Sequence, residues 1–416
     1  MRTDIIRSLL GQGLLSGHGL LLSSAVLVFG TPVQFGVYSL AFSLALMMSV
    51  LQNALLNSHL GMALTRSRTD QGYSPAVVMA LVGGSLAFSL AGAAATAAIV
   101  VITIGDDWRT VTLCAVYVAA YLLRETLRTY QFARQDAARV LRQDAGFILA
   151  TFAALPLTWY GLDVLDGVLA AYACGGLLLV GQAAAVLRAN LGGAPLRQVL
   201  SQFRLYGRDM GWALAGVVSN EIMHRTYVFV VTGAFGVAVL GGMQAARLLF
   251  SPHTLMFSAW GRVALPRCVR TLAEGRRRDA LRTIWLALGG FVVLNLLGAV
   301  AILAAWPLLE AYVFRGRYPD VGIYVAGWAV VTLLFHVRSG LSLHLQAERR
   351  FAGLAGAGAL GALVSTLVLV AATGARPWTA ILAICIGEVV HLAGIVLLQL
   401  KPSAPAARRA AAVEGA

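Results

Sequence analysis

The chain alternates between long apolar segments and short polar connections. A membrane-spanning helix needs about 20 mostly apolar residues to cross the hydrocarbon core of a bilayer. Segments of this kind recur twelve times, at residues 8–29, 35–57, 76–104, 111–132, 146–160, 165–187, 211–232, 235–258, 283–305, 322–345, 353–373 and 378–400. The pattern predicts an all-α polytopic membrane protein with about twelve transmembrane helices.

Composition supports this interpretation. Apolar residues make up 59% of the 416 residues and charged residues only 12%, whereas soluble domains are about 45–50% apolar and about 25% charged. So few charges do not cover a water-facing surface, which excludes a soluble enzyme, a disordered chain and a secreted disulfide scaffold. The four cysteines lie far apart in the sequence, without the spacing of a metal or redox site. We therefore expect neither a metal nor a cofactor.

The basic residues are distributed unevenly among the polar connections. The formal net charge is +14. Successive connections between spans lie on opposite sides of the membrane. Those on one side hold most of the arginines, whereas those on the other side hold only Arg109, Arg315, Arg317 and Arg376. Because cytoplasmic connections carry the excess of Arg and Lys, both termini are predicted to be cytoplasmic. This requires an even number of spans, which twelve satisfies. The basicity then reflects topology, and no nucleic acid is expected as a partner.

The two halves of the chain repeat each other weakly. Residues 35–37 (FGV) recur at 235–237, and residues 63–66 (ALTR) correspond to 264–267 (ALPR), with nearly the same offset. This indicates duplication into two parallel six-helix lobes, which in transporters are related by an axis along the membrane normal and surround a central cleft. The predicted parts are an N-terminal lobe (1–190), a cytoplasmic linker (191–206), a C-terminal lobe (207–401) and a disordered cytoplasmic tail (402–416).

Four stretches in the second half carry a family resemblance. They are residues 233–237 (GAFGV), 244–247 (QAAR), 264–267 (ALPR) and 274–281 (EGRRRDAL). With the arrangement of six plus six spans, they make the chain resemble the polysaccharide exporters of the multidrug/oligosaccharidyl-lipid/polysaccharide flippase superfamily. The resemblance covers the whole length and implies a fold like that of the superfamily's multidrug (MATE) exporters.

The resemblance also implies an activity. A flippase of this family moves an undecaprenyl-pyrophosphate-linked oligosaccharide from the cytoplasmic to the periplasmic leaflet of the bacterial inner membrane. The expected partners are membrane lipid, this lipid-linked oligosaccharide and the polysaccharide polymerase machinery. The lipid II branch of the family resembles a version with two further C-terminal spans, so the chain is expected to serve O-antigen or exopolysaccharide biosynthesis.

Two arginines on one helix face are the first candidates for substrate binding. Arg124 and Arg128 lie four residues apart in the fourth predicted span. A charge at the bilayer centre costs roughly 2.5–3.5 kcal/mol on insertion scales, so such side chains face the protein interior or water. Two guanidiniums on one face suit a pyrophosphate, since each donates in a fork that matches phosphate oxygens. The alternative is that both side chains snorkel to the cytoplasmic surface.

The seventh predicted span carries Glu221, His224 and Arg225 near its middle. Glutamate four residues before arginine is the favoured direction for a helical ion pair. One interpretation is a self-neutralised pair that lowers the cost of insertion. The other makes Arg225 a phosphate ligand and Glu221 or His224 the site of proton or sodium coupling.

Three further residues complete the predicted substrate site. Arg247 lies midway along the eighth span, too deep to snorkel, and Arg338 lies nearer the cytoplasm in the tenth. His18 lies in the first span, where the alternative is a core histidine packed among its neighbours. Because Arg225 and Arg247 have no basic counterparts in the first half, we expect the C-terminal lobe to supply most of the anion-binding charge.

Two other functions compete with the flippase. A polyprenyl-sugar glycosyltransferase or polymerase needs a carboxylate in its first external loop or a long periplasmic loop. Residues 30–34 (GTPVQ) carry no carboxylate, and the longest outside connection is short. A cation-coupled multidrug antiporter of the same superfamily favours acidic membrane sites, whereas arginines outnumber glutamates within these spans. The sequence therefore predicts a transporter of an anionic substrate and not an enzyme.

Overall fold

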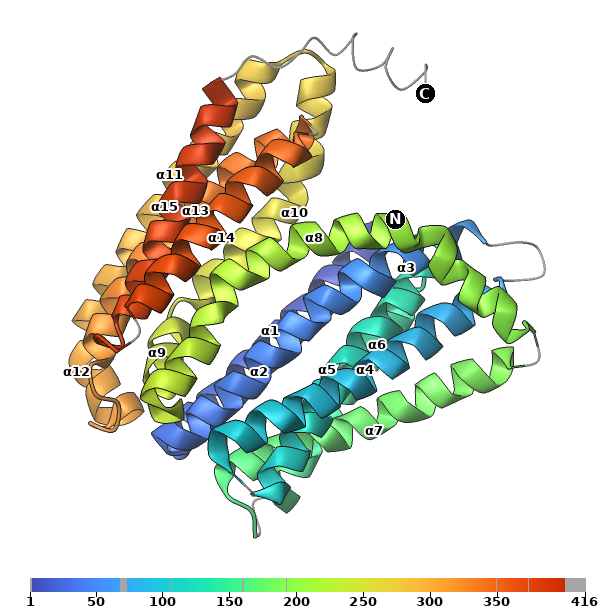
Figure 1. The fold of residues 1–416 in the computed structure, drawn as a ribbon, viewed down its shortest axis with the longest axis horizontal. Helices are drawn as coiled ribbons and strands as arrows, with labels where there is room; N and C mark the ends of the chain where they lie inside the picture. The colour runs from blue at the N-terminus through green and yellow to red at the C-terminus, as the bar shows by residue number, and fades with distance from the viewer. Residues whose placement is uncertain are drawn as a thin grey trace. The chain divides into compact units, whose positions relative to one another are not determined.

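The computed structural model describes residues 2–67, 73–105, 107–158, 161–191, 193–348, 350–372 and 374–400. Most of these residues are α-helical and none forms a strand, as the sequence predicts for a polytopic membrane protein (Figure 1). The α-helices are α1 (Arg2–Phe29), α2 (Pro32–Gln52), α3 (Ser58–Arg66), α4 (Pro75–Ile104), α5 (Trp108–Ala133), α6 (Ala137–Thr158), α7 (Val164–Asn190), α8 (Leu196–Phe235), α9 (Val237–Leu248), α10 (Ser251–Ala273), α11 (Arg277–Ala304), α12 (Trp306–Leu308), α13 (Val321–Ala347), α14 (Phe351–Ala371) and α15 (Thr379–Leu400). Two π-helical segments, η1 (Asn53–Asn57) and η2 (Leu309–Phe314), follow α2 and α12.

Each of the twelve predicted spans lies largely within one or more helices of the described chain. Nine of these helical segments are long and apolar enough to cross a membrane on length and composition alone. The other three predicted spans, at residues 146–160, 211–232 and 235–258, are not among these nine segments. Helix α6 begins at Ala137 instead of residue 146 and so includes three charged residues, and the 40-residue α8 is also charge-bearing. Residues 159, 160 and 373, at the ends of two predicted spans, lie outside the described residues.

The eighth predicted span is not one helix. It divides after Leu248 into α9 and α10, with Pro252 in the first turn of α10. Proline has no backbone N–H and fixes φ near the helical value, so it suits a helix start and does not continue the preceding helix. The prediction of a single span over residues 235–258 is therefore wrong in its continuity.

The chain packs as two compact units. Unit 1 comprises Met1–Glu221, Arg225–Leu248 and Pro307–Val321, and unit 2 comprises Ile222–His224, Leu249–Trp306 and Gly322–Ala416. Residues 196–206, within the predicted linker, form the first turns of α8, since this stretch contains neither Gly nor Pro after Pro195. The boundaries of the two six-helix lobes stay a prediction, and the predicted tail at 402–416 lies outside the described residues.

In unit 1, helices α1, α2, α4, α5, α6 and α7 run side by side (Figure 1). Helix α9 packs against α2 at the repeated FGV motif. A Cβ at Gly36 would collide with the backbone carbonyl of Val237, and one at Gly241 with the carbonyl of Pro32. Small residues allow this close approach of two helices, as is usual within membranes.

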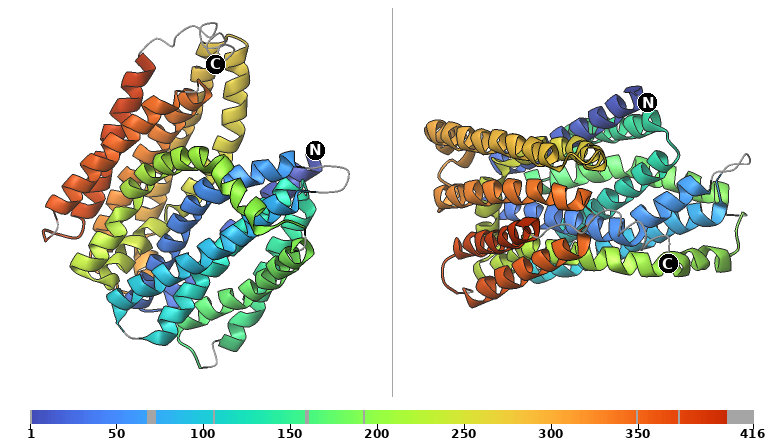
Figure 2. Two further views of the ribbon diagram at one scale, coloured as in Figure 1. Left: turned by 45° about the vertical axis from the view of Figure 1, so that its right-hand side comes forward. Right: turned by 90° about the horizontal axis from the view of Figure 1, so that it is seen from above.

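Unit 2 contains helices α10, α11, α13, α14 and α15, which lie alongside one another in all three views (Figures 1 and 2). Helices α14 and α15 approach closely, because a Cβ on Gly361 would lie 2.8 Å from the Gly387 carbonyl. An apolar cluster joins four of the five helices; its buried members are Phe257, Cys268, Ala280, Ile284, Leu288, Leu341, Leu345 and Ile395.

The start of α5 is fixed by a side-chain cap. The Asp107 carboxylate accepts the Thr110 hydroxyl at 2.7 Å and the Thr110 backbone N–H at 3.5 Å. These hydrogen bonds, that of the hydroxyl above all, hold the pKa of Asp107 below its usual value. An N-terminal cap of this type satisfies a donor that the helix itself leaves free. It sets where α5 begins and hence where its charged residues lie.

Candidate functional site

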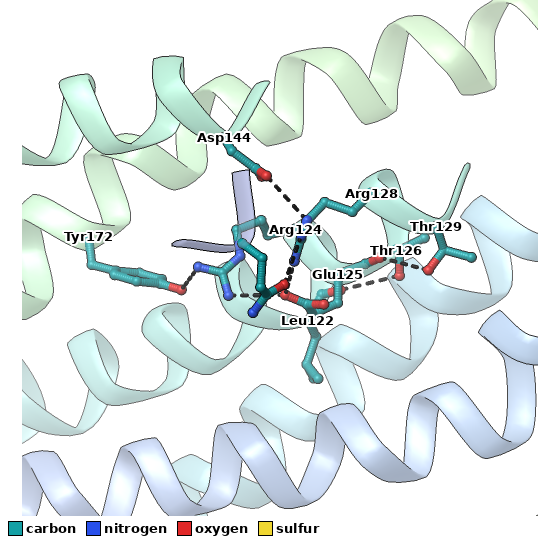
Figure 3. Close-up of polar contacts among 9 residues, drawn as sticks. Leu122, Arg124, Glu125, Thr126, Arg128, Thr129, Asp144 and Tyr172 are labelled. Atoms are coloured by element: carbon teal, nitrogen blue, oxygen red, sulfur yellow. Dashed lines mark hydrogen bonds and ion pairs between the residues drawn. The ribbon is translucent and has the colours of Figure 1, made fainter. Parts of the chain in front are cut away.

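Arg124 is buried within unit 1 on α5. Its Nη1 donates to the Tyr172 hydroxyl on α7 at 3.0 Å, and its Nη2 donates to Glu125 Oε1 at 3.1 Å (Figure 3). The guanidinium also lies over two aromatic rings, 4.6 Å from the centre of Tyr121 and 5.5 Å from that of Phe147. Rings at these distances stabilise a cation through their quadrupole. The side chain is therefore held inside the bundle and does not snorkel.

Arg128 lies on the same face of α5 and contacts two further helices. Its Nη2 donates to Gln12 Oε1 on α1 at 3.2 Å. Its Nε lies 3.3 Å from Asp144 Oδ2 on α6, and its Nη1 lies 3.6 Å from Glu125 Oε1 (Figure 3). We call Arg124, Glu125, Arg128 and Asp144 the α5 cluster. Its two guanidiniums and two carboxylates balance in formal charge.

Hydrogen bonding within the α5 cluster is incomplete. Arg124 Nε is buried and has no hydrogen-bond partner among the described residues. Arg128 Nε and Asp144 Oδ2 form an ion pair at 3.3 Å but are not aligned as a hydrogen bond, and Asp144 Oδ1 has no hydrogen-bond partner among the described residues. A buried donor without an acceptor costs about 1–3 kcal/mol, and more when it is charged. Glu125, the acid that both arginines share, is the most exposed member, at 27% of its side chain. The cluster therefore retains donors for an anion, and its most accessible acid is the one an anion would replace.

His18 on α1 lies beside the α5 cluster. It is 2% exposed and contacts three rings, edge-on to Phe147 and Phe152 and stacked on Tyr172 at a centroid distance of 6.1 Å. Its Nε2 has no hydrogen-bond partner among the described residues. His18 is thus buried among aromatic rings, one of which is the tyrosine bonded to Arg124.

Arg225, Glu221 and Arg247 also belong to unit 1. Arg225 Nε donates to Glu221 Oε2 at 2.6 Å, the helical ion pair expected from their spacing. Arg247 on α9 donates to the Tyr227 hydroxyl at 3.1 Å, and its charge repels that of Arg225. Four of the five predicted arginines therefore lie in one compact unit, although two of them come from the second half of the sequence.

Arg338 lies in unit 2 and is fully engaged by a carboxylate. Its Nε and Nη2 donate to the two oxygens of Glu388 on α15, at 2.5 and 3.3 Å. The His224 Nε2 lies 3.3 Å from Glu388 Oε1 and 3.4 Å from Arg338 Nη2. We call Arg338, Glu388 and His224 the Glu388 cluster. The Glu388 side chain is 0% exposed, so this cluster is a bidentate ion pair in the protein interior.

The sequence identified the arginines but missed most of their partners. Glu125 stands three residues before Arg128, a spacing that by itself predicts an ion pair. Asp144 was missed because it precedes the predicted start of its span, whereas α6 begins earlier. Tyr172 and Glu388 come from helices distant in the sequence, so no local pattern could assign them to these arginines.

Comparisons with known proteins place the fold. No protein-family model matches the chain, and no curated protein matches it. One similar solved structure is a multidrug resistance MATE family transporter of the MOP superfamily in an inward-facing conformation, with a TM-score of 0.59 and 15% identity over 92% of this chain and 93% of that one. A second is the lipid II flippase MurJ in an inward closed conformation, with a TM-score of 0.69 and 9% identity over 96% of this chain and 88% of that one. A third is a MOP superfamily transporter from Pyrococcus furiosus, with a TM-score of 0.56 and 14% identity over 95% of this chain and 93% of that one.

These three proteins are transporters or flippases and not enzymes. The similarity extends over almost the whole chain, although few residues are identical. It shows that the chain shares the fold of these proteins. The protein is a multi-pass membrane protein with the fold of the MOP-superfamily transporters.

Proposed function

We propose that the protein is a flippase that moves a lipid-pyrophosphate-linked oligosaccharide from the cytoplasmic to the periplasmic leaflet of the bacterial inner membrane. The translocated lipid then serves surface polysaccharide biosynthesis, where a polymerase consumes it. The observation that carries this proposal is the α5 cluster, in which two buried arginines share one half-buried acid and retain unsatisfied donors. A MATE-like fold supports transport by alternating access.

The pyrophosphate would replace Glu125 as the acceptor for both arginines. Arg124 and Arg128 keep their positions through Tyr172 and Gln12, which do not depend on Glu125. Charge-assisted hydrogen bonds to phosphate are roughly twice as strong as neutral ones, and the guanidinium fork fits them well. Release follows when Glu125 returns to the two guanidiniums. The cluster thus binds an anion reversibly without leaving either arginine unpaired.

We propose that the seventh predicted span couples transport to the movement of a proton. Glu221 is held by Arg225 at 2.6 Å, so His224 is the stronger candidate for a proton site. It lies 3.3 Å from Glu388, and a second proton on its ring would convert this contact into an ion pair. Replacing His224 by Gln is expected to remove the dependence of transport on a proton gradient while leaving substrate binding unchanged. A gradient dependence equal to that of the unaltered protein would assign coupling elsewhere.

The experiment is complementation of a deletion strain. Arg124→Gln and Arg128→Gln are each expected to reduce surface polysaccharide at least tenfold at normal membrane expression. The matched control is Arg109→Gln, because the Arg109 side chain is 62% exposed and its ion pair with Asp166 is long at 3.9 Å. This variant should complement the deletion strain fully. A deletion strain with unchanged surface polysaccharide and a new sensitivity to cationic drugs would contradict the proposal and favour the multidrug antiporter.

A further inference from the structure

An apolar groove of about 580 Å³ opens on the surface of unit 1 along α1 and α6. This volume lies within the range of about 300–1,000 Å³ typical of small-molecule sites. The residues that line it are Leu10, Gly13, Leu14, Gly17, His18, Leu21, Ile148 and Phe152. All of them except His18 are non-polar. The groove is therefore suited to hydrocarbon, with a single polar ring in its wall.

The shape of the groove follows from the spacing of residues on α1. Leu10, Leu14, Leu21 and the two glycines recur at helical intervals and share one face of the helix. A Cβ on Gly13 or Gly17 would meet no atom within 4 Å, so the missing side chains are what opens the space. At 1.5 Å per residue, the lining from residue 10 to residue 21 extends roughly 16 Å along the helix. The groove is thus elongated along α1.

The groove adjoins the α5 cluster through two sets of contacts. Phe152 in its wall contacts His18 edge-on at 5.3 Å, and His18 stacks on Tyr172, which binds Arg124 at 3.0 Å. On the same stretch of α1, Gln12 accepts a hydrogen bond from Arg128 at 3.2 Å. Hence one face of α1 lines the groove, and Gln12 on the same helix binds the guanidinium of Arg128.

We propose that this groove holds the polyprenyl chain of the substrate next to the site where Arg124 and Arg128 bind its pyrophosphate. The inference rests on the proposed function and adds where the lipid portion binds. A polyprenyl pyrophosphate joins an anionic group directly to one apolar chain, and the structure joins a cationic cluster directly to one apolar groove. Bilayer phospholipids carry two acyl chains, whereas the groove is a single apolar track along α1.

Filling the groove tests the proposal. The double variant Gly13→Leu/Gly17→Leu places side chains in space that is empty beside α1, and leucine favours a helix more than glycine does. The matched control is Gly181→Leu on α7, because a Cβ at Gly181 also meets no atom within 4 Å. Binding is measured in phosphatidylglycerol nanodiscs with two probes, undecaprenyl pyrophosphate and inorganic pyrophosphate.

The expected result separates the tail from the head group. The double variant should bind undecaprenyl pyrophosphate at least tenfold more weakly than the unaltered protein and Gly181→Leu do, and bind inorganic pyrophosphate equally well. Arg124→Gln should weaken both probes. Undecaprenyl pyrophosphate bound as tightly by the double variant as by the control would overturn the groove assignment, and a simultaneous loss of co-purified phosphatidylglycerol would assign the groove to bulk lipid. If the unaltered protein binds neither probe, the proposed function itself fails, and with it the groove assignment.

Discussion

The α5 cluster and the Glu388 cluster are both buried groups of arginine and glutamate, yet their bonding differs. Glu388 receives both arms of one guanidinium and contacts one imidazole, and its side chain is 0% exposed. Glu125 serves two guanidiniums through a single oxygen and is 27% exposed. The acid of the Glu388 cluster is fully buried and bonded by both of its oxygens. The α5 cluster has a partly exposed acid and donors without a hydrogen-bond partner among the described residues.

This difference separates an arginine that supports the fold from arginines that bind a ligand. A buried ion pair recovers its desolvation cost only when its geometry is good and its remaining donors are satisfied. Arg338 meets that condition within the protein, so an anion would have to break the pair before binding. Arg124 and Arg128 meet it only in part, so an anion improves their bonding. Burial of an arginine in a span is therefore a weak criterion for a substrate site, and unsatisfied donors are a better one.

The largest expected effect comes from breaking the closed cluster. Arg338→Met leaves the Glu388 carboxylate buried without its guanidinium, and removing one partner of a buried pair typically costs about 3–5 kcal/mol. We expect a large fall in the Tm of the purified protein, measured by thermal unfolding in detergent. The double variant Arg338→Met/Glu388→Met should recover most of that loss, because it leaves no unpaired charge. A double variant as unstable as the single one would mean that the cluster does more than pair two charges.

The next effect sharpens the open cluster. Glu125→Gln removes the charge that competes with a ligand for Arg124 and Arg128, so inorganic pyrophosphate should bind about tenfold more tightly, which corresponds to about 1.4 kcal/mol. Binding is measured by calorimetry on the purified protein. Glu221→Gln is the control, because Glu221 pairs with Arg225 and not with the α5 cluster. Weaker binding by Glu125→Gln would indicate that Glu125 positions the arginines instead of competing with the ligand.

The sequence predicted the helices well because each span must contain enough apolar residues for the bilayer, and that requirement is local. It also singled out Arg124, Arg128 and Arg338, which the structure buries, but not the buried Asp144. It predicted the Glu221–Arg225 pair, which lies on one helix. It did not predict the partners of Arg124 and Arg338, since Tyr172 approaches Arg124, and Glu388 approaches Arg338, only when helices distant in the sequence pack together. The same reason explains why Arg247 was assigned with the C-terminal half, whereas α9 packs against α2 in unit 1.

The groove was also beyond prediction from sequence. Its seven apolar lining residues resemble any lipid-facing stretch, and glycines such as Gly13 and Gly17 are common in membrane helices. What distinguishes them is the adjacent α6, which supplies Phe152 and Ile148 to the opposite wall. That pairing of α1 with α6 is a property of the fold. His18 was identified from its polarity alone, and its contact with Phe152 gives it a place beside the groove.

A smaller effect is expected from the N-terminal cap of α5. Asp107→Ala removes the acceptor for the Thr110 N–H and one of two acceptors for the Thr110 hydroxyl, which also lies 2.8 Å from Asp166 Oδ1. Loss of a cap costs about 1 kcal/mol. Since the folded-state pKa of Asp107 is below its usual value, its contribution is fully present above the unfolded-state pKa and is lost as pH falls through the folded one. The measurement is Tm at neutral and at acidic pH. A Tm difference from the unaltered protein that persists at the lowest pH would show that the carboxylate charge is not what stabilises the helix start.

The smallest effect is expected at an arginine that also contacts two acids but lies at the surface. Arg276, just before α11, binds Asp279 Oδ2 at 2.8 Å and Glu274 Oε2 at 3.1 Å, and these hydrogen bonds, the one to Asp279 first, raise its pKa. Its side chain is 60% exposed, so water replaces either acid at little cost and salt screens the pairs. Arg276→Ala should leave the Tm and the affinity for pyrophosphate within experimental error of those of the unaltered protein. Its two ion pairs are as short as those in the α5 cluster. An effect comparable with that of Arg124→Gln would therefore mean that the proximity of opposite charges determines which arginines bind pyrophosphate, and that burial with unsatisfied donors does not.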